Sequence, residues 1–166
     1  MRAWFFQCYN LQAAPTIPNG VTDIWSAFEY CTSLKTPPTL PNSVTSMNAC
    51  FLGCSSLESA PEIPINAGLK ELCSVFSGCV NLKTGPSVIP GNIDDMQSCF
   101  EGAGLDGSNT ITVFAAIYSS TKWGNTFKDC PNVKLHTFIT GSDETLAVKD
   151  AIKNATGNDP SKISFE

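Results

Sequence analysis

The feature that most constrains the fold of this chain is a sequence motif that recurs every 23 to 27 residues. Its clearest copy runs from Met47 to Pro64. The motif places a phenylalanine at the same position of each unit: Phe5, Phe28, Phe51, Phe76, Phe100 and Phe127. Successive phenylalanines are 23, 23, 25, 24 and 27 residues apart. A period in this range predicts the stacked coils of a solenoid, in which each unit buries its apolar side against its neighbours.

Each unit reads apolar-x3-Phe-x2-Cys-x2-Leu and is followed by Pro-x-Ile-Pro or a variant of it. Apolar residues four and seven positions apart share one face of a short helix, so Met47, Phe51 and Cys54 are predicted to point together. A glycine before the cysteine, such as Gly53, suits the end of that helix. The prolines remove backbone donors, so the second half of each unit is predicted to be a short, irregular strand.

Four columns of buried side chains should therefore run along the array: an apolar anchor, then Phe, Cys and Leu. The cysteine and leucine columns comprise Cys8, Cys31, Cys54, Cys79, Cys130, Leu11, Leu34, Leu57 and Leu82. Because no coil buries its apolar side alone, loss of one column member should weaken the neighbouring coils as well.

The pattern drifts in the fifth unit and stops after Val133. Residues 102–109 have the composition of a loop, and residues 110–118 that of a strand. Residues 142–155 read as an amphipathic helix with Ser142 as N-cap, and residues 162–165 as a final strand. The predicted fold class is thus an α/β repeat solenoid over residues 1–140, a right-handed stack with short helices on one side and irregular strands on the other, closed by a C-terminal cap over residues 141–166.

These motifs resemble the BspA-like, Treponema-type leucine-rich repeats, whose coils carry a similar apolar…Phe-x2-Cys-x2-Leu…Ile-Pro pattern. The resemblance covers residues 1–133, and five of the six units have both the Phe and the Cys, the fifth having Ala103 instead. The chain departs from the family pattern by an additional proline in the Pro-x-Ile-Pro segment. The family more often has a strand of β-branched residues there. The resemblance implies a leucine-rich-repeat fold and a role in surface attachment or adhesion to a host matrix, with a location on a cell surface or particle.

Composition excludes several classes of protein. The net charge is −5, and the ten basic residues are scattered singly, which argues against nucleic-acid binding. The longest apolar run, from Ile111 to Tyr118, is too short to cross a membrane. No basic-then-apolar leader is visible at the amino terminus. Met1 already occupies the anchor position, which favours a fragment of a longer array or an end covered by a partner.

The eight cysteines allow three interpretations. The column cysteines are explained by the repeat as buried free thiols, because adjacent members would have poor disulfide geometry. A zinc site from Cys50, Cys54, Cys73 and Cys79 has plausible spacing, but it is disfavoured because two of these belong to the column. Cys50, Cys73 and Cys99 lie outside the column and could form disulfides; the sequence leaves their oxidation state open.

Catalytic signatures are weak. His136 is the only histidine, and no nucleophile stands in a recognisable motif with it. The acidic pairs Asp94-Asp95 and Asp143-Glu144 precede segments predicted to be helical, where they suit a helix N-terminus. The Gly-x-Gly at Gly102 lacks the context of a phosphate-binding loop. The sequence therefore predicts a protein that is not an enzyme and needs no cofactor or metal.

Variable positions around an invariant core indicate an extended contact face. After the leucine column and between the prolines, the charged candidates for ligand contact are Lys35, Glu58, Glu62 and Lys83. The aromatic candidates are Trp4, Tyr9, Trp25 and Tyr30, all in the first two coils. Each of these positions has an alternative interpretation, as a solvated residue or as packing between coils.

Two functional hypotheses follow. The first is a binding protein whose extended face engages a protein or glycan ligand. The second is a structural or assembly module of a larger microbial surface or virus-particle protein, which would self-associate through the first coil. An adhesive domain should bind a foreign ligand as an isolated domain. An assembly module should instead associate with itself or require the assembly to which it belongs.

Overall fold

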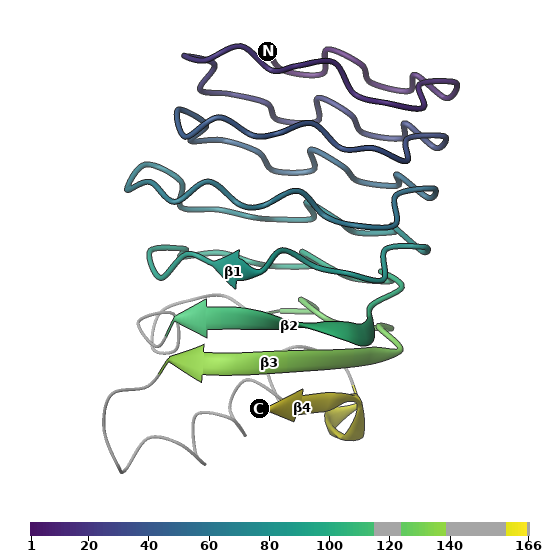
Figure 1. The fold of residues 1–166 in the computed structure, drawn as a ribbon, viewed down its shortest axis with the longest axis vertical. Coiled ribbons are helices and arrows are strands. Elements are labelled where there is room, and N and C mark those ends of the chain that lie inside the picture. Colours follow the sequence, from purple (N-terminus) through teal and green to yellow (C-terminus); the bar gives the residue numbers. More distant parts are fainter. Residues whose placement is uncertain (115–123, 139–158, 166) are drawn as a thin grey trace.

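The computed structural model describes residues 1–114, 124–138 and 159–165, and it shows a chain wound into coils stacked one on another (Figure 1). The first coil lies at one end of the stack and the carboxyl terminus at the other. The elements are β1 (Val88–Ile89), β2 (Asp106–Phe114), β3 (Asn132–Phe138), the 3-10 helix η2 (Pro160–Lys162) and β4 (Ile163–Phe165).

The strands form a parallel sheet in the order β1-β2-β3-β4, one strand from each successive coil. Ile89 pairs with Val113, and Leu135 pairs with Phe165. Between one coil and the next among the first four, the same side of the stack forms isolated bridges, such as Ala13 with Thr36 and Ser59 with Thr84. The reason is the proline pair in each of those coils, since proline donates no hydrogen bond to a neighbour. Strands β2 and β3 contain no proline and extend over 9 and 7 residues.

The phenylalanines form one continuous stack through the core. Successive rings lie 5.2 to 5.6 Å apart between centroids, and their planes differ by 3° to 17°. Phe28, Phe51, Phe76, Phe100 and Phe127 are buried, whereas Phe5 in the first coil is only partly buried. Stacked aromatic pairs stabilise a fold beyond the area that they bury, so this column ties each coil to the next.

The side of each coil that carries the phenylalanine consists of successive turns. In each coil three N–H groups donate to carbonyls of the following coil. They belong to the phenylalanine and to the residues two positions before and after it. In the second coil these bonds are Ser26 to Asn48, Phe28 to Cys50 and Tyr30 to Leu52. The alternate N–H groups bond within their own coil, as Cys31 does to Phe28. Half of the peptide groups here therefore serve the neighbouring coil.

The predicted fold class is wrong in its secondary structure. The described part of the chain contains no α-helix, and its one helical element is η2, so the predicted α/β stack of helices and strands is not formed. A helix would direct every N–H along its own axis and leave none for the next coil. The turns instead require a left-handed backbone on both sides of the phenylalanine, with φ of 55° at Ala49 and 70° at Gly53 around Phe51. Gly53 is thus part of the turn and does not end a helix.

Two further predictions concern the carboxyl-terminal third. Residues 102–109, predicted as a loop, contain the first residues of β2. The final strand lies at Ile163–Phe165, within the predicted residues 162–165. The capping helix predicted at 142–155, and the domain boundary at residue 140, lie outside the described residues.

Side chains of the anchor and leucine positions fill the space on both sides of the phenylalanine stack. Ile24, Met47 and Met96 are fully buried, as are Leu34, Leu57 and Leu82. Leu11, in the first coil, is only partly buried. Among the described residues these positions are therefore buried from the second coil onward and partly buried in the first.

Candidate binding surfaces on the first two coils

Exposed apolar side chains concentrate at one end of the stack. Seven large hydrophobic residues of the described chain are exposed, and five of them lie within residues 4–30: Trp4, Phe6, Tyr9, Trp25 and Tyr30. The other two, Ile65 and Val80, lie on later coils. Exposed aromatic side chains that cluster on one region mark interaction surfaces far better than isolated ones do.

Trp25 is held in place by Arg2. The Arg2 guanidinium carbon lies 4.8 Å from the centre of the Trp25 ring, and its Nε donates to the carboxylate of Asp23. Burial raises the pKa of Asp23, but the Arg2 hydrogen bond and the Trp25 backbone N–H outweigh it, so the pKa lies below its usual value. Arg2, Ala3, Trp25 and Ser26 line a shallow hollow beside this pair. A charged group and an indole are thereby fixed side by side.

Tyr30 is held in a similar way by Phe6. The two rings meet edge to face, with centroids 6.5 Å apart and planes at 72°. Tyr30 also covers Gly53 of the next coil so closely that a methyl group there would lie 2.5 Å from Cδ1 of the ring. We call Arg2, Phe6, Trp25 and Tyr30 the lateral aromatic patch.

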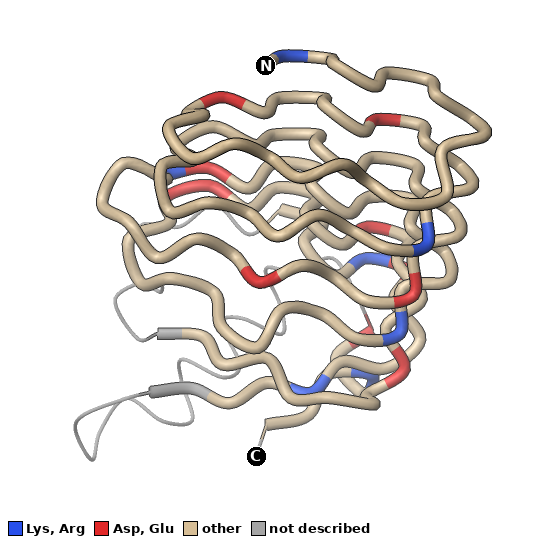
Figure 2. Tube along the Cα trace, turned by 45° about the horizontal axis from the view of Figure 1, so that its top comes forward, with Lys and Arg blue, Asp and Glu red and all other residues tan. Residues whose placement is uncertain are grey.

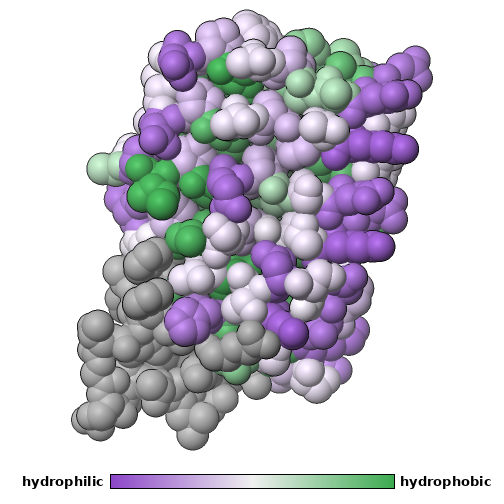
Figure 3. All heavy atoms as spheres, in the orientation of Figure 1, coloured by the Kyte–Doolittle hydropathy of each residue, from purple (hydrophilic) through white to green (hydrophobic). Residues whose placement is uncertain are grey.

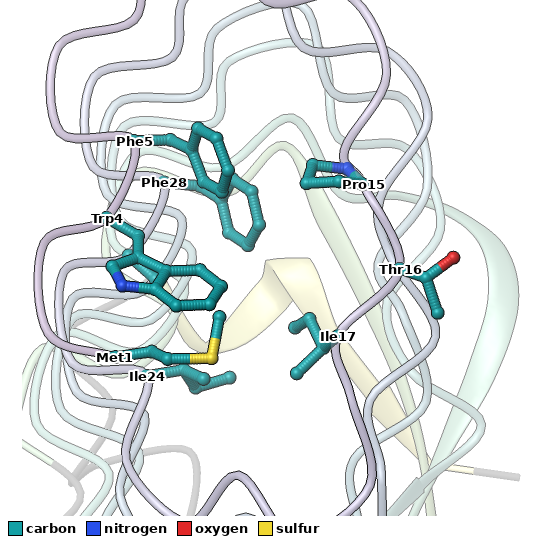
Figure 4. A pocket seen from close by; sticks show the side chains of 9 residues that line it. Met1, Trp4, Phe5, Pro15, Thr16, Ile17, Ile24 and Phe28 are labelled. Atoms are coloured by element: carbon teal, nitrogen blue, oxygen red, sulfur yellow. The ribbon is translucent and has the colours of Figure 1, made fainter.

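Trp4 belongs to a different surface. It occupies the position before the phenylalanine, where the later coils carry buried small side chains such as Ala27 and Val75. Its indole lies over a hollow at the end of the stack (Figure 4), which is lined by Met1, Trp4, Phe5, Pro15, Thr16, Ile17, Ile24, Ala27 and Phe28. The structure therefore separates Trp4, at the open end of the core, from Trp25 and Tyr30 on the side of the stack. Tyr9 is 52% exposed.

The charged candidates lie after the leucine column and on the extended side of the coils. Lys35, Glu58 and Lys83 are exposed and occupy equivalent positions, and the Lys83 N–H donates to the Glu58 carbonyl. Charged residues follow one another along one edge of the stack (Figure 2), and hydrophilic side chains gather along one edge of the face in the space-filling view (Figure 3). Glu62 is already bonded, because its carboxylate accepts from both the N–H and the hydroxyl of Ser87. These residues form a solvated edge and are not part of the lateral aromatic patch.

All eight cysteines have free thiols in the structure. Thiols of the column donate to the phenylalanine carbonyl of the preceding coil: Cys31 to Phe5, Cys54 to Phe28, Cys79 to Phe51 and Cys130 to Phe100, at 3.0 to 3.1 Å. Cys50 and Cys99 are buried directly before a phenylalanine, where Ala27 and Val75 lie in other coils. Burial raises the pKa of Cys79 and Cys130 to about 12. These buried thiols therefore stay protonated at neutral pH.

The described residues assemble no metal centre. No group of three or more His, Cys, Asp or Glu side chains there could hold a metal ion, including the four cysteines considered for zinc. His136 lies on β3 opposite Thr112 of β2. Asp95 accepts the N–H of Gln97 in a turn, while Asp143 and Glu144 lie outside the described residues. No helix of the described part is both long and apolar enough to cross a membrane.

Comparison with protein-family models, with curated proteins and with solved structures finds no match to this chain. Its surfaces are thus interpreted on their own geometry.

The sequence reasoning missed Arg2 and Phe6. Alignment on the phenylalanine column places Phe6 with Glu29 and Glu101, at a position that is polar in most coils. An aromatic residue there is the signal that could have identified it. The contact of Arg2 with Trp25 depends on the distance between coils, which the sequence alone does not provide.

Proposed function

We propose that this protein is a non-enzymatic binding protein that holds a protein or glycan ligand on its lateral aromatic patch. The observation that carries the proposal is the concentration of exposed aromatic side chains on the first two coils. Tryptophan, tyrosine and arginine are enriched among the few residues that carry most of the binding energy of an interface. The two aromatic side chains also bury a large area with few rotatable bonds.

The patch is also preorganised. Arg2 lies over Trp25, and Phe6 lies edge-on to Tyr30, so these rings lose little conformational freedom when a ligand arrives. The surrounding coils are held by the buried phenylalanine stack and by backbone hydrogen bonds between coils. An adhesive role, in which a rigid surface engages a foreign ligand, agrees with this arrangement.

The test is binding of the immobilised chain to a glycan array and to extracellular-matrix proteins. A chain carrying Trp25→Ala and Tyr30→Ala should lose at least about tenfold in affinity, which corresponds to about 1.4 kcal/mol. The matched control carries Ile65→Ala and Val80→Ala, which remove exposed apolar side chains elsewhere on the stack. Equal loss in both variants, with thermal stability unchanged, would contradict the assignment.

The second candidate is a structural or assembly module of a larger microbial surface or virus-particle protein. The observation that favours it is that each coil is held chiefly by its neighbours, through the phenylalanine stack and the backbone hydrogen bonds between coils. Light scattering over a range of concentrations separates the two functions, because an assembly module should associate with itself and ignore the foreign ligands.

A further inference from the structure

Charged side chains alternate in sign along one edge of the stack. The residue that follows the leucine is basic in the second and fourth coils and acidic in the third and fifth. These residues, which we call the charge ladder, are Lys35, Glu58, Lys83 and Asp106. All four are exposed, and Figure 2 shows basic and acidic residues in turn down one edge. The ladder therefore extends over four coils.

The stacking of the coils sets the interval of the charge ladder. From the second coil to the fifth, successive phenylalanine rings lie 5.2 to 5.6 Å apart. The Lys83 N–H donates to the Glu58 carbonyl, so these two neighbours are joined through the backbone. The Ser108 hydroxyl donates to Asp106 and lowers the pKa of that carboxyl, and the charge of Lys83 lowers it further. Opposite charges thus follow one another at a short, regular interval.

The ladder charges are available to a partner. No ion pair among the described residues includes a member of the ladder. The side chains next to the ladder are short, as Ser33 and Thr36 are beside Lys35, so a facing surface can reach the charged groups. A partner that supplies opposite charges would form ion pairs without breaking any within this chain.

The order of the signs decides which partner fits. A surface of a single sign would attract two members of the ladder and repel the other two, so a nucleic acid or a polybasic segment gains little. A second copy of this chain, turned end over end, presents the same row in reverse. Glu58 then faces the partner's Lys83, and Lys35 faces the partner's Asp106. Every charge in the row meets its opposite.

The interval favours a second copy as well. Several ion pairs form at once only if the charges of the two surfaces recur at the same step, and another stack of this chain has the same step. Two copies side by side in the same direction, without a shift, would bring like charges together. In the reversed arrangement the next positions outward are Gln12 and Lys134, which meet without repulsion because one is neutral.

We propose that the charge ladder pairs two copies of this chain edge to edge and antiparallel, about a twofold axis that passes between Glu58 and Lys83. Four ion pairs form, two between Glu58 and Lys83 and two between Lys35 and Asp106. A twofold contact uses the same surface on both copies and closes at two. It thus differs from the continued association of an assembly module. It includes no residue of the lateral aromatic patch and does not depend on the ligand proposed there.

Sedimentation equilibrium of the full chain tests the pairing. Glu58→Lys sets two lysines opposite each other at the axis, and Lys83→Glu sets two carboxylates there. Each change should weaken dimerisation by at least about tenfold, because like charges then face each other. The matched control is Lys70→Glu, which changes the net charge as Lys83→Glu does but lies outside the ladder, and it should dimerise normally. A native chain that stays monomeric at about 1 mM, or a dimer that neither reversal weakens, would overturn the proposal.

Two combinations of these variants exclude loss of folding as the cause. An equimolar mixture of the Glu58→Lys and Lys83→Glu chains should form heterodimers, because lysine again faces carboxylate at the axis. One chain that carries both changes keeps its net charge and should pair with itself, whereas a parallel pairing shifted by one coil would be lost. If either combination stays monomeric, the twofold arrangement is refuted.

Salt and the lateral patch provide two further readouts. Dimerisation should weaken at about 0.5 M salt, because exposed ion pairs are screened. A dimer that is insensitive to salt would contradict pairing through the ladder. The chain with Trp25→Ala and Tyr30→Ala should dimerise normally, so failure of the lateral aromatic patch and failure of the ladder are distinguishable.

Discussion

The ring of Phe51 lies 5.6 Å from the ring of Phe76, with only 3° between their planes. The same ring lies 5.5 Å from Phe28 on its other face. One side chain thus links three coils. The backbone of Phe51 adds two bonds to the following coil, because its N–H donates to the carbonyl of Val75 and its carbonyl accepts the thiol of Cys79.

Replacement of Phe51 by alanine should be among the most damaging single changes. Truncation of a buried phenylalanine typically costs about 3–5 kcal/mol, because it leaves a cavity as well as removing contacts. Phe5→Ala should cost clearly less, because that ring is only partly buried and stacks on one neighbour. Urea denaturation followed by circular dichroism measures both. Similar losses for the two variants would show that the stack does not carry the stability.

Two glycines at equivalent positions should respond differently to alanine. Gly53 and Gly78 both have a left-handed backbone, with φ of 70° and 71°, so each substitution should cost about 1–2 kcal/mol from strain. A methyl group at Gly53 would also collide with the ring of Tyr30, whereas at Gly78 the nearest atom is 3.6 Å away. Gly53→Ala should therefore be the more destabilising.

The Tyr30→Ala background provides the control for this comparison. With the ring removed, Gly53→Ala should cost no more than Gly78→Ala in a double-mutant cycle. A difference that persisted without Tyr30 would mean that the backbone, and not the aromatic contact, distinguishes the two glycines.

Gly104 should not tolerate any side chain. A methyl group there would clash with the carbonyl oxygen of Val80. This oxygen belongs to the backbone of the preceding coil, so a change of side-chain rotamer cannot relieve the clash. The Gly104 N–H donates to the carbonyl of Cys79, so the two coils touch at this point. Gly104→Ala should lower the unfolding midpoint more than Gly78→Ala does. Thermal unfolding of the pair checks this, and equal midpoints would contradict the close approach.

Alkaline pH should destabilise the fold. Burial raises the pKa of Cys31 to about 11 and the pKa of Cys79 to about 12, above the ordinary thiol value of 9.0. A raised pKa contributes stability that is complete below the unfolded value and is lost as the pH rises through the folded value, here from about 9 to about 12. For the deeply buried Cys79 thiol the loss reaches up to about 1.4 kcal/mol per pH unit in that window.

Urea midpoints at pH 8, 9 and 10 measure this loss. Cys79→Ala should reduce the alkaline slope, although it lowers stability at pH 8 by removing a buried side chain. The matched control is Cys8→Ala, which removes an exposed thiol. An alkaline slope that is identical in all three chains would show that the buried thiols are not its source.

The period of the sequence carries more information than its local propensities. Recurrence alone indicates that Phe51 has counterparts in other coils, and the ring stack occupies those positions. The local pattern around Met47 predicts a helix because its apolar residues are spaced by four and seven. The same spacing also fits successive turns in which Met47, Phe51 and Cys54 all face inward within one coil. A segment forms a helix if its N–H groups bond within the segment, and turns if half of them bond to the next coil. Which of the two occurs is a property of the whole stack and not of one segment.

The candidate surfaces were predictable to a different extent. Trp25 and Tyr30 could be chosen because aromatic residues stand where other coils have small or polar ones. The orientation of Trp4 over the end hollow depends on the first coil having no described neighbour on that side, and the Arg2 contact depends on side-chain reach across coils. The spacing of the residues in the sequence predicts neither the orientation of Trp4 nor the Arg2 contact.

The one-way direction of the hydrogen bonds on the turn side has an electrostatic consequence. Three peptide groups in each coil point their carbonyls toward the first coil and their N–H groups away from it. Their dipoles add along the stack as they do along an α-helix, with the negative pole at the first coil. On the other sides several N–H groups point back toward the preceding coil, as Lys35 does to Gln12 and Thr45 does to Thr22. The polarity therefore belongs to the turn side, and lengthening the stack by whole coils should strengthen it there without altering any single contact.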